Sequence, residues 1–167
     1  DREGRIPLII GEPRHPEVMG VASWSDRSVI FPGPEELEKW LLQEPSRQSL
    51  SLTAVAQTTC IRTIWETSKE ILKKLCTNAK IFDTICSATH RRQLEAAELA
   101  AQADVMVVVG DRKSANTKHL AEICRKACPV VYQIEQAGEL TTGFLSRCTM
   151  AGLTAGASTP AGIIKEV

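Results

Sequence analysis

Short apolar runs alternate along the chain with longer segments in which apolar residues recur every three or four positions. The short runs favour buried strands, and the longer segments favour amphipathic helices. The run Val-Met-Val-Val-Val at residues 105–109 has no polar face, which is typical of a parallel strand covered on both sides. Such alternation indicates the α/β class. The pattern predicts strands at residues 6–10, 29–31, 52–56, 105–109, 130–134 and 152–155, and helices at 35–42, 61–75, 89–103, 116–127 and 161–167.

The second half of the chain repeats the pattern of the first half. Residues 9–17 align with residues 108–116, and residues 55–59 align with residues 155–159. In each aligned segment an apolar run leads into a loop with small or polar residues. We therefore predict two tandem copies of one three-layer α/β lobe, each with a small, mostly parallel sheet.

The two copies differ at their starts. The second opens with Asp-Thr-Ile-Cys at residues 83–86 and a predicted helix before its first strand, whereas the first begins almost directly with a strand. We place the two domains at residues 1–83 and 84–167. The difference predicts that the chain is a fragment or a truncated variant of a longer protein. The alternative is that the first copy never had the helix.

The charge balance, apolar runs and cysteines argue against several classes of protein. Twenty Lys and Arg residues balance twenty Asp and Glu residues, which argues against a nucleic-acid binder that works by charge. The first apolar run, residues 6–10, is too short for a membrane span or a signal-peptide core. We therefore expect a cytoplasmic protein without a membrane or nucleic-acid partner. Six cysteines without a Cys-x-x-Cys pair indicate thiols or metal ligands rather than a disulfide framework.

Four loops that follow predicted strands carry small polar residues. In a parallel α/β sheet, ligands bind beyond the carboxyl ends of the strands, where helix N-termini attract anions such as phosphate. The same side chains could instead cap their own helices. Four similarly equipped loops favour an anion site. The loops are residues 11–17, 57–59, 110–116 and 156–158.

Reactive side chains occur in or near these loops. His15 can bind an anion or transfer protons near neutral pH, and Glu17 can supply a proton; an ordinary turn with Glu17 in a first helical turn is the alternative. Cys86 precedes a predicted helix, where the thiolate is favoured, although burial as a structural thiol is the common state of a cysteine. Cys124 and Cys128 lie one turn apart on a predicted helix, and we expect a packed core face there rather than a metal site.

Five motifs in order along the chain together resemble one known family. They are His-Pro-Glu-Val at 15–18, Gln-Thr-Thr at 57–59, Ile-Cys-Ser-Ala-Thr at 85–89 followed by Arg-Gln at 92–93, Val-Gly at 109–110 with Ser-Ala-Asn at 114–116, and Thr-Ala-Gly-Ala-Ser-Thr-Pro at 154–160. Over almost its whole length the chain is similar to the LytB-type 4-hydroxy-3-methylbut-2-enyl diphosphate reductases. These iron–sulfur enzymes end the non-mevalonate route to isoprenoids.

The resemblance implies a three-lobed, pseudo-symmetric α/β protein of which this chain holds the second and third lobes. Each lobe would give one cysteine to a central 4Fe-4S cluster, and Cys86 would be the ligand from the last lobe. Two electrons and two protons would remove the hydroxyl of an allylic diphosphate as water, giving isopentenyl and dimethylallyl diphosphates. The implied protein partner is an electron donor such as ferredoxin or flavodoxin.

The resemblance also implies roles for the loop residues. Glu17 would be the proton source, and Thr58 would position it and relay the proton. The diphosphate would be held by His15, Ser114, Asn116 and Ser158, with Gln57 supporting that network.

The chain departs from the family pattern in ways that limit what it could do alone. The first lobe and the cysteine of the middle lobe are absent, and Ala115 stands where relatives often have a second serine. One thiolate cannot hold a four-iron cluster, so we expect this chain alone to lack the cluster and to be inactive. The alternative function is a non-catalytic module that binds a phosphate ligand with the same loops. A third hypothesis is a ligand-free folding domain that self-associates at its sheet edge.

Overall fold

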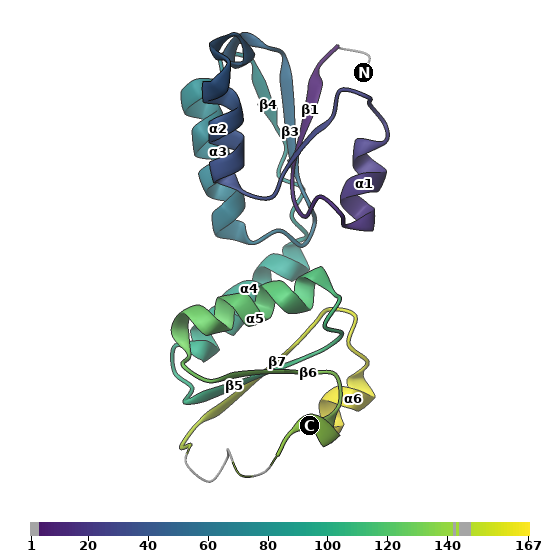
Figure 1. Ribbon diagram of the computed structural model, residues 1–167. Helices are drawn as coiled ribbons and strands as arrows, with labels where there is room; N and C mark the ends of the chain where they lie inside the picture. The colour runs from purple at the N-terminus through teal and green to yellow at the C-terminus, as the bar shows by residue number, and fades with distance from the viewer. Residues whose placement is uncertain (1–3, 142, 144–147) are drawn as a thin grey trace. The chain divides into compact units, whose positions relative to one another are not determined.

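The computed structural model describes residues 4–141, 143 and 148–167, and the chain divides into two compact units, residues 1–86 and 87–167 (Figure 1). The division falls after Cys86, whereas the sequence pattern predicts it after Asp83. Residues 84–86 therefore pack with the first unit. The identification of the two units with family lobes stays a prediction.

The first unit is built on a four-stranded parallel sheet in the order β2-β1-β3-β4. Helix α1 lies on one side of this sheet, and α2 and α3 lie on the other (Figure 1). The elements are β1 (Ile6–Ile10), α1 (Pro16–Ala22), β2 (Val29–Phe31), α2 (Pro34–Gln43), the 3-10 helix η1 (Pro45–Ser49), β3 (Leu52–Ala56), α3 (Arg62–Leu75) and β4 (Ala79–Ile81).

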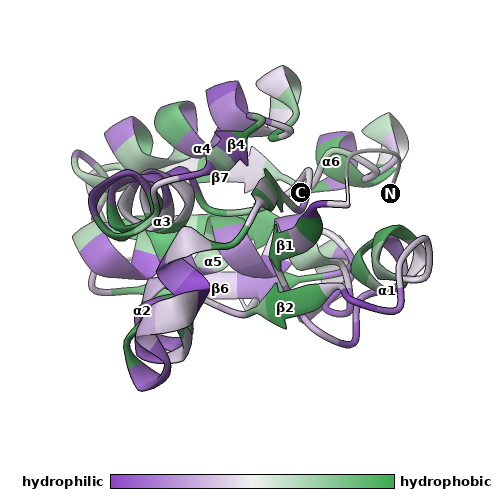
Figure 2. Cartoon of the chain, turned by 90° about the horizontal axis from the view of Figure 1, so that it is seen from above, coloured by the Kyte–Doolittle hydropathy of each residue, from purple (hydrophilic) through white to green (hydrophobic). Residues whose placement is uncertain are grey.

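Helix α3 shows how the apolar pattern builds this core. Trp65 and Leu72 are fully buried, and Ile64, Ile71 and Leu75 pack against the same cluster. Figure 2 shows both hydrophilic and hydrophobic segments on the helices, as expected for elements with one face on a sheet. Each fully buried side chain of this size contributes roughly 1.5–3 kcal/mol to folding. The side chains buried on α3 thus recur every three or four residues, the spacing from which the helix is predicted.

The second unit has a three-stranded parallel sheet in the order β6-β5-β7. Every residue of the central strand is buried, as its uninterrupted apolar run predicts. Helices α4 and α5 cover one face and α6 covers the other (Figure 1). The elements are α4 (Ser87–Ala100), β5 (Val105–Val109), α5 (Ala115–Ala127), β6 (Val131–Ile134), the 3-10 helix η2 (Ala137–Glu139), β7 (Ala151–Ala155) and α6 (Ala161–Glu166).

The two sheets share one topology. In each unit the first strand is central, the second pairs on one side and the third on the other. This arrangement confirms the predicted α/β class with small parallel sheets and repeated lobes.

Helix α1, the 3-10 helix η1 and strand β4 of the first unit were not predicted. Helix α1 has seven residues and buries only Val18, so its sequence carries almost no apolar period. Strand β4 has three residues, Ala-Lys-Ile, and lies at the sheet edge. Such short elements are determined by tertiary pairing more than by local sequence. Among the described residues, none of the helices combines the length and apolar character needed to cross a bilayer.

Candidate functional site

Glu17 and Thr58 form a two-point contact beyond the carboxyl end of the first sheet. The Thr58 backbone N–H donates to Glu17 Oε1 over 2.7 Å, and the Thr58 hydroxyl donates to Oε2 over 3.0 Å. Glu17 lies in the first turn of α1, and Thr58 follows β3. Because both oxygens are held, the carboxylate has one orientation.

His15 caps the helix that carries Glu17. Its Nδ1 accepts the Glu17 backbone N–H over 3.2 Å, and Pro16 occupies the first helical position, where it sacrifices no hydrogen bond. The local turn that was the alternative for this segment is therefore present, and it places the His15 ring beside the Glu17–Thr58 pair.

Gln57 connects the loop that follows β3 to the loop that follows β1. It is 2% exposed, and its Oε1 accepts the Glu12 backbone N–H over 2.9 Å. A Cβ at Gly11 would lie 2.7 Å from Gln57 Cβ, so only glycine allows this approach. Within the described part of the chain, Gln57 Nε2 is buried and has no hydrogen-bond partner.

Cys86 lies next to the same pair. Its backbone N–H donates to the Thr58 carbonyl over 2.9 Å, and the residue is exposed. Helix α4 begins at the following residue. Across residues 4–141, 143 and 148–167, no group of three or more His, Cys, Asp or Glu side chains is placed to hold a metal ion. Cys86 is the exposed cysteine beside Thr58 that could serve as one ligand of a metal cluster.

Three other cysteines are buried and serve the core. Burial raises the pKa of the Cys60 thiol to about 12. Burial, with Cys128 nearby, raises that of Cys124 to about 11. Cys124 and Cys128 pack in the core of the second unit, which confirms the packed face expected for them. Protonated buried thiols are poor metal ligands and nucleophiles.

The first turn of helix α5 carries buried polar atoms that have no hydrogen-bond partner among the described residues. Ser114 caps the helix by accepting the Thr117 N–H over 3.5 Å. Asn116 is 5% exposed, yet neither its Oδ1 nor its Nδ2 has a partner in the described part of the chain, and the same holds for Thr117 Oγ1. An unpaired buried polar group costs about 1–3 kcal/mol, so such groups call for a ligand or water.

A cavity of about 420 Å³ lies over the end of β5, lined by Gly110, Lys113, Glu135 and Ser158 among others. Ser158 thus lines the cavity, whereas Ser114 and Asn116 lie outside its lining. Lys113 adds a cationic group that the sequence analysis did not select.

Two glycines let the loops after β5 and β7 approach helix α5. A Cβ at Gly110, whose φ is +144°, would lie 2.8 Å from Thr117 Oγ1, and one at Gly156 would lie 2.5 Å from it. The loops that carry Ser114 and Ser158 are therefore drawn together around Thr117. Thr117 is not marked by any sequence signal beyond its place directly after the Ser-Ala-Asn motif.

The predicted site residues thus form two groups, one in each unit. His15, Glu17, Gln57, Thr58 and Cys86 meet at the carboxyl end of the first sheet. Ser114, Asn116 and Ser158 lie on the loops and helix start that follow strands of the second sheet.

The chain was compared with known proteins by sequence. The family model described as LytB protein matches residues 1–167. The 4-hydroxy-3-methylbut-2-enyl diphosphate reductase of Caldanaerobacter subterraneus subsp. tengcongensis is 41% identical over 167 residues, covering 99% of this chain and 56% of that protein. The protein of the same name from Anaeromyxobacter sp. (strain K) is 37% identical over 168 residues, covering 99% of this chain and 58% of its own length. The chain spans little more than half the length of these relatives.

Solved structures agree with this result. The E-1-hydroxy-2-methyl-but-2-enyl-4-diphosphate reductase from Plasmodium falciparum matches with a TM-score of 0.87 and 24% identity, over 98% of this chain and 51% of that one, and shows the fold alone. A structure of (E)-4-hydroxy-3-methyl-but-2-enyl diphosphate reductase, described as the terminal enzyme of the non-mevalonate pathway, matches with a TM-score of 0.52 and 30% identity, over 99% of this chain and 58% of that one. With the family model matching every residue, this chain belongs to the LytB protein family.

Proposed function

We propose that the complete protein of which this chain is part reduces 4-hydroxy-3-methylbut-2-enyl diphosphate to isopentenyl and dimethylallyl diphosphates. The observation that carries the proposal is the contact of Thr58 with both Glu17 and Cys86, which sets a candidate proton donor beside a candidate cluster ligand. The names of the relatives supply the substrate. In the reaction the carbon–oxygen bond of the substrate hydroxyl breaks, two electrons enter, one proton leaves in water and one bonds to carbon.

The Glu17–Thr58 pair suits proton transfer because it accommodates both states of the carboxyl. The Thr58 hydroxyl donates to ionised Glu17, and by rotating it can accept the proton of neutral Glu17. The Thr58 backbone N–H holds the other oxygen throughout. Glu17 is therefore the residue that we assign as the proton source, with Thr58 positioning it.

The diphosphate would be held by neutral and cationic donors at the strand ends. Asn116 supplies a buried amide, without a partner among the described residues, at the N-terminus of α5, where the helix dipole favours an anion. Ser158 lines the neighbouring cavity, and Ser114 lies at the helix cap. In the first unit His15 would bind the anion, and Gln57 would hold the loop below it.

An iron–sulfur cluster, when bound, supplies electrons and an open iron site that polarises the substrate hydroxyl. Cys86 is the residue of this chain that we assign to it, because its thiol is exposed beside Thr58. The remaining thiolates would come from outside residues 1–167, so this chain alone would be inactive. A ferredoxin or flavodoxin would donate the electrons, and the cytoplasm would keep the thiols reduced.

The test is anaerobic reconstitution of the complete protein with iron and sulfide, followed by turnover with a reduced donor. We expect cluster absorption and formation of both isomeric diphosphates. Diphosphate binding by complete protein that takes up no cluster and does not reduce the hydroxyl would instead support the alternative, a non-catalytic phosphate-binding module.

Asn116→Leu in the complete protein is expected to weaken substrate binding while preserving or raising stability. The amide has no hydrogen-bond partner to lose among the described residues, and burying it unpaired costs about 1–3 kcal/mol, so an apolar side chain of similar size removes a penalty. Binding should fall by about ten-fold to a hundred-fold, from the loss of a charge-assisted hydrogen bond in a closed site. Calorimetric titration and denaturant unfolding measure the two effects. Lower stability with unchanged affinity would show that the amide serves the fold.

Ser158→Ala should reduce affinity by a similar amount without the gain in stability.

Thiol mapping should separate Cys86 from the buried cysteines. In folded, cluster-free complete protein at pH 8 we expect iodoacetamide to label Cys86 and to spare Cys60 and Cys124, whose raised pKa values and burial keep them protonated. Loading the cluster should protect Cys86. Mass spectrometry of the digested protein reads the labels, and equal labelling of Cys86 with and without the cluster would contradict its role as a ligand.

A further inference from the structure

The residues that lead to Cys86 run beside the end of β3 in a strand-like register. The Phe82 N–H donates to the Ala54 carbonyl over 2.9 Å, and the Cys86 N–H donates to the Thr58 carbonyl over 2.9 Å. Both bonds continue the parallel pairing of β4 with β3, which places Ile81 opposite Ala54. The segment thus extends the sheet edge to the candidate site.

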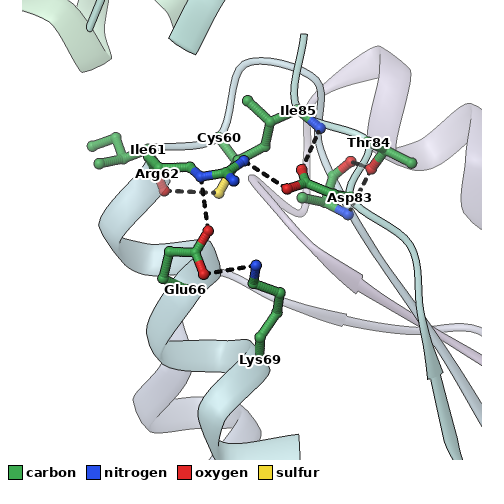
Figure 3. Close-up of polar contacts among 9 residues, drawn as sticks. Cys60, Ile61, Arg62, Glu66, Lys69, Asp83, Thr84 and Ile85 are labelled. Carbon is green, nitrogen blue, oxygen red and sulfur yellow. Dashed lines mark hydrogen bonds and ion pairs between the residues drawn. The ribbon is translucent and has the colours of Figure 1, made fainter. Parts of the chain in front are cut away.

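Between these two backbone hydrogen bonds, the side chain of Thr84 pairs with β3 in place of a backbone group. The Thr84 hydroxyl accepts the Ala56 N–H over 2.9 Å and donates to the Ala56 carbonyl (Figure 3). One hydroxyl therefore satisfies both polar groups of the last residue of β3. Ala56 is buried, so loss of the hydroxyl would remove the partner of two buried backbone groups.

Asp83 anchors the same segment from its other side. Its Oδ2 pairs with Arg62 Nη1 over 2.7 Å, and its Oδ1 accepts the Ile85 N–H over 3.3 Å (Figure 3). Arg62 in turn pairs with Glu66 on the next turn of α3, over 2.8 Å. These partly exposed ion pairs contribute little each, so Thr84 is the stronger anchor.

We propose that Thr84 is a positioning residue that fixes Cys86 relative to the Glu17–Thr58 pair. The inference rests on the proposed function, in which Cys86 binds the cluster and Glu17 supplies the proton. Thr58 holds Glu17 with its N–H and hydroxyl and holds the Cys86 backbone with its carbonyl. Thr84 lies two residues before Cys86, and its two bonds to Ala56 fix the register in which this segment pairs with β3. A slip of one residue would move the thiol by about 3.3 Å along the strand, whereas a misplacement of about 1 Å can cost a hundred-fold in rate.

The test is Thr84→Val in the complete, cluster-loaded protein, because valine keeps the shape and removes both hydroxyl bonds. We expect loss of the cluster to an iron chelator to accelerate about ten-fold, the electron paramagnetic resonance spectrum of the reduced cluster to change, and kcat to fall about ten-fold to a hundred-fold. Affinity for inorganic diphosphate should stay unchanged, because Thr84 does not belong to the group that would bind it. Thr84→Ser should restore all three properties.

Thr67→Val is the matched control, since Thr67 lies on the exposed side of α3 and its replacement should leave every property unchanged. An unaltered spectrum and chelation rate in folded Thr84→Val would overturn the inference, as would failure of Thr84→Ser to restore them. If Thr84→Val does not fold, Thr84→Ala is measured in its place because it also removes both hydroxyl bonds, and cluster loss no faster than in Thr67→Val overturns the inference. Full iron content in Cys86→Ser would instead overturn the ligand assignment in the proposed function.

Discussion

Cys86→Ser in the complete protein is expected to abolish the stable 4Fe-4S cluster and to reduce turnover to background. Cys86 is an exposed thiol, and its backbone is fixed to Thr58 at the strand ends. A serine hydroxyl remains protonated near neutral pH and replaces a thiolate poorly as a ligand of iron. Iron and sulfide content, cluster absorption and substrate reduction measure the result.

Cys76→Ser provides the control for this experiment. Cys76 caps the C-terminus of α3 in the same unit and is half-buried, away from the contacts of Thr58. Its replacement should leave both iron content and turnover close to those of the unmodified protein. Equal iron content in Cys86→Ser and Cys76→Ser would exclude Cys86 as a ligand.

Glu17→Gln is expected to lower kcat by about a hundred-fold to ten-thousand-fold, the range for loss of a general acid. Glutamine keeps the geometry, because its Oε1 can accept the Thr58 N–H and its amide can donate to the Thr58 hydroxyl. Substrate affinity and cluster content should therefore be retained. Single-turnover kinetics separate the chemical step from binding.

Glu70→Gln, on the exposed face of α3, is the charge-matched control and should leave kcat unchanged. An unchanged kcat in Glu17→Gln would remove Glu17 from the role of proton source. A loss of substrate affinity with kcat intact would instead assign it to binding.

Among the described strands, all except β4 follow directly from the apolar runs. β1, β3 and β5 have the predicted bounds, because a fully covered parallel strand needs apolar residues at nearly every position. Helix α1 and strand β4 could not be found in the same way. Each is too short to show a period of apolar residues, and each forms because it packs or pairs with a neighbouring strand or loop.

The candidate site was predictable where it depends on topology. Parallel strands end at one edge, so the loops that carry Glu17 and Thr58 had to come together, and they do. The contact between Thr84 and Ala56 depends on a side chain replacing the backbone in a sheet, for which no sequence period exists. That the Asn116 amide has no partner among the described residues likewise emerges only from packing, because no sequence pattern shows which polar atoms the fold leaves unpaired.

The most direct test of the account is diffraction at the iron absorption edge from crystals of the complete, anaerobically reconstituted protein with its diphosphate substrate. We expect iron bonded to Cys86 Sγ, with the diphosphate in hydrogen-bond contact with Asn116 and Ser158. Iron held entirely by other residues, with the diphosphate remote from both of these side chains, would contradict it.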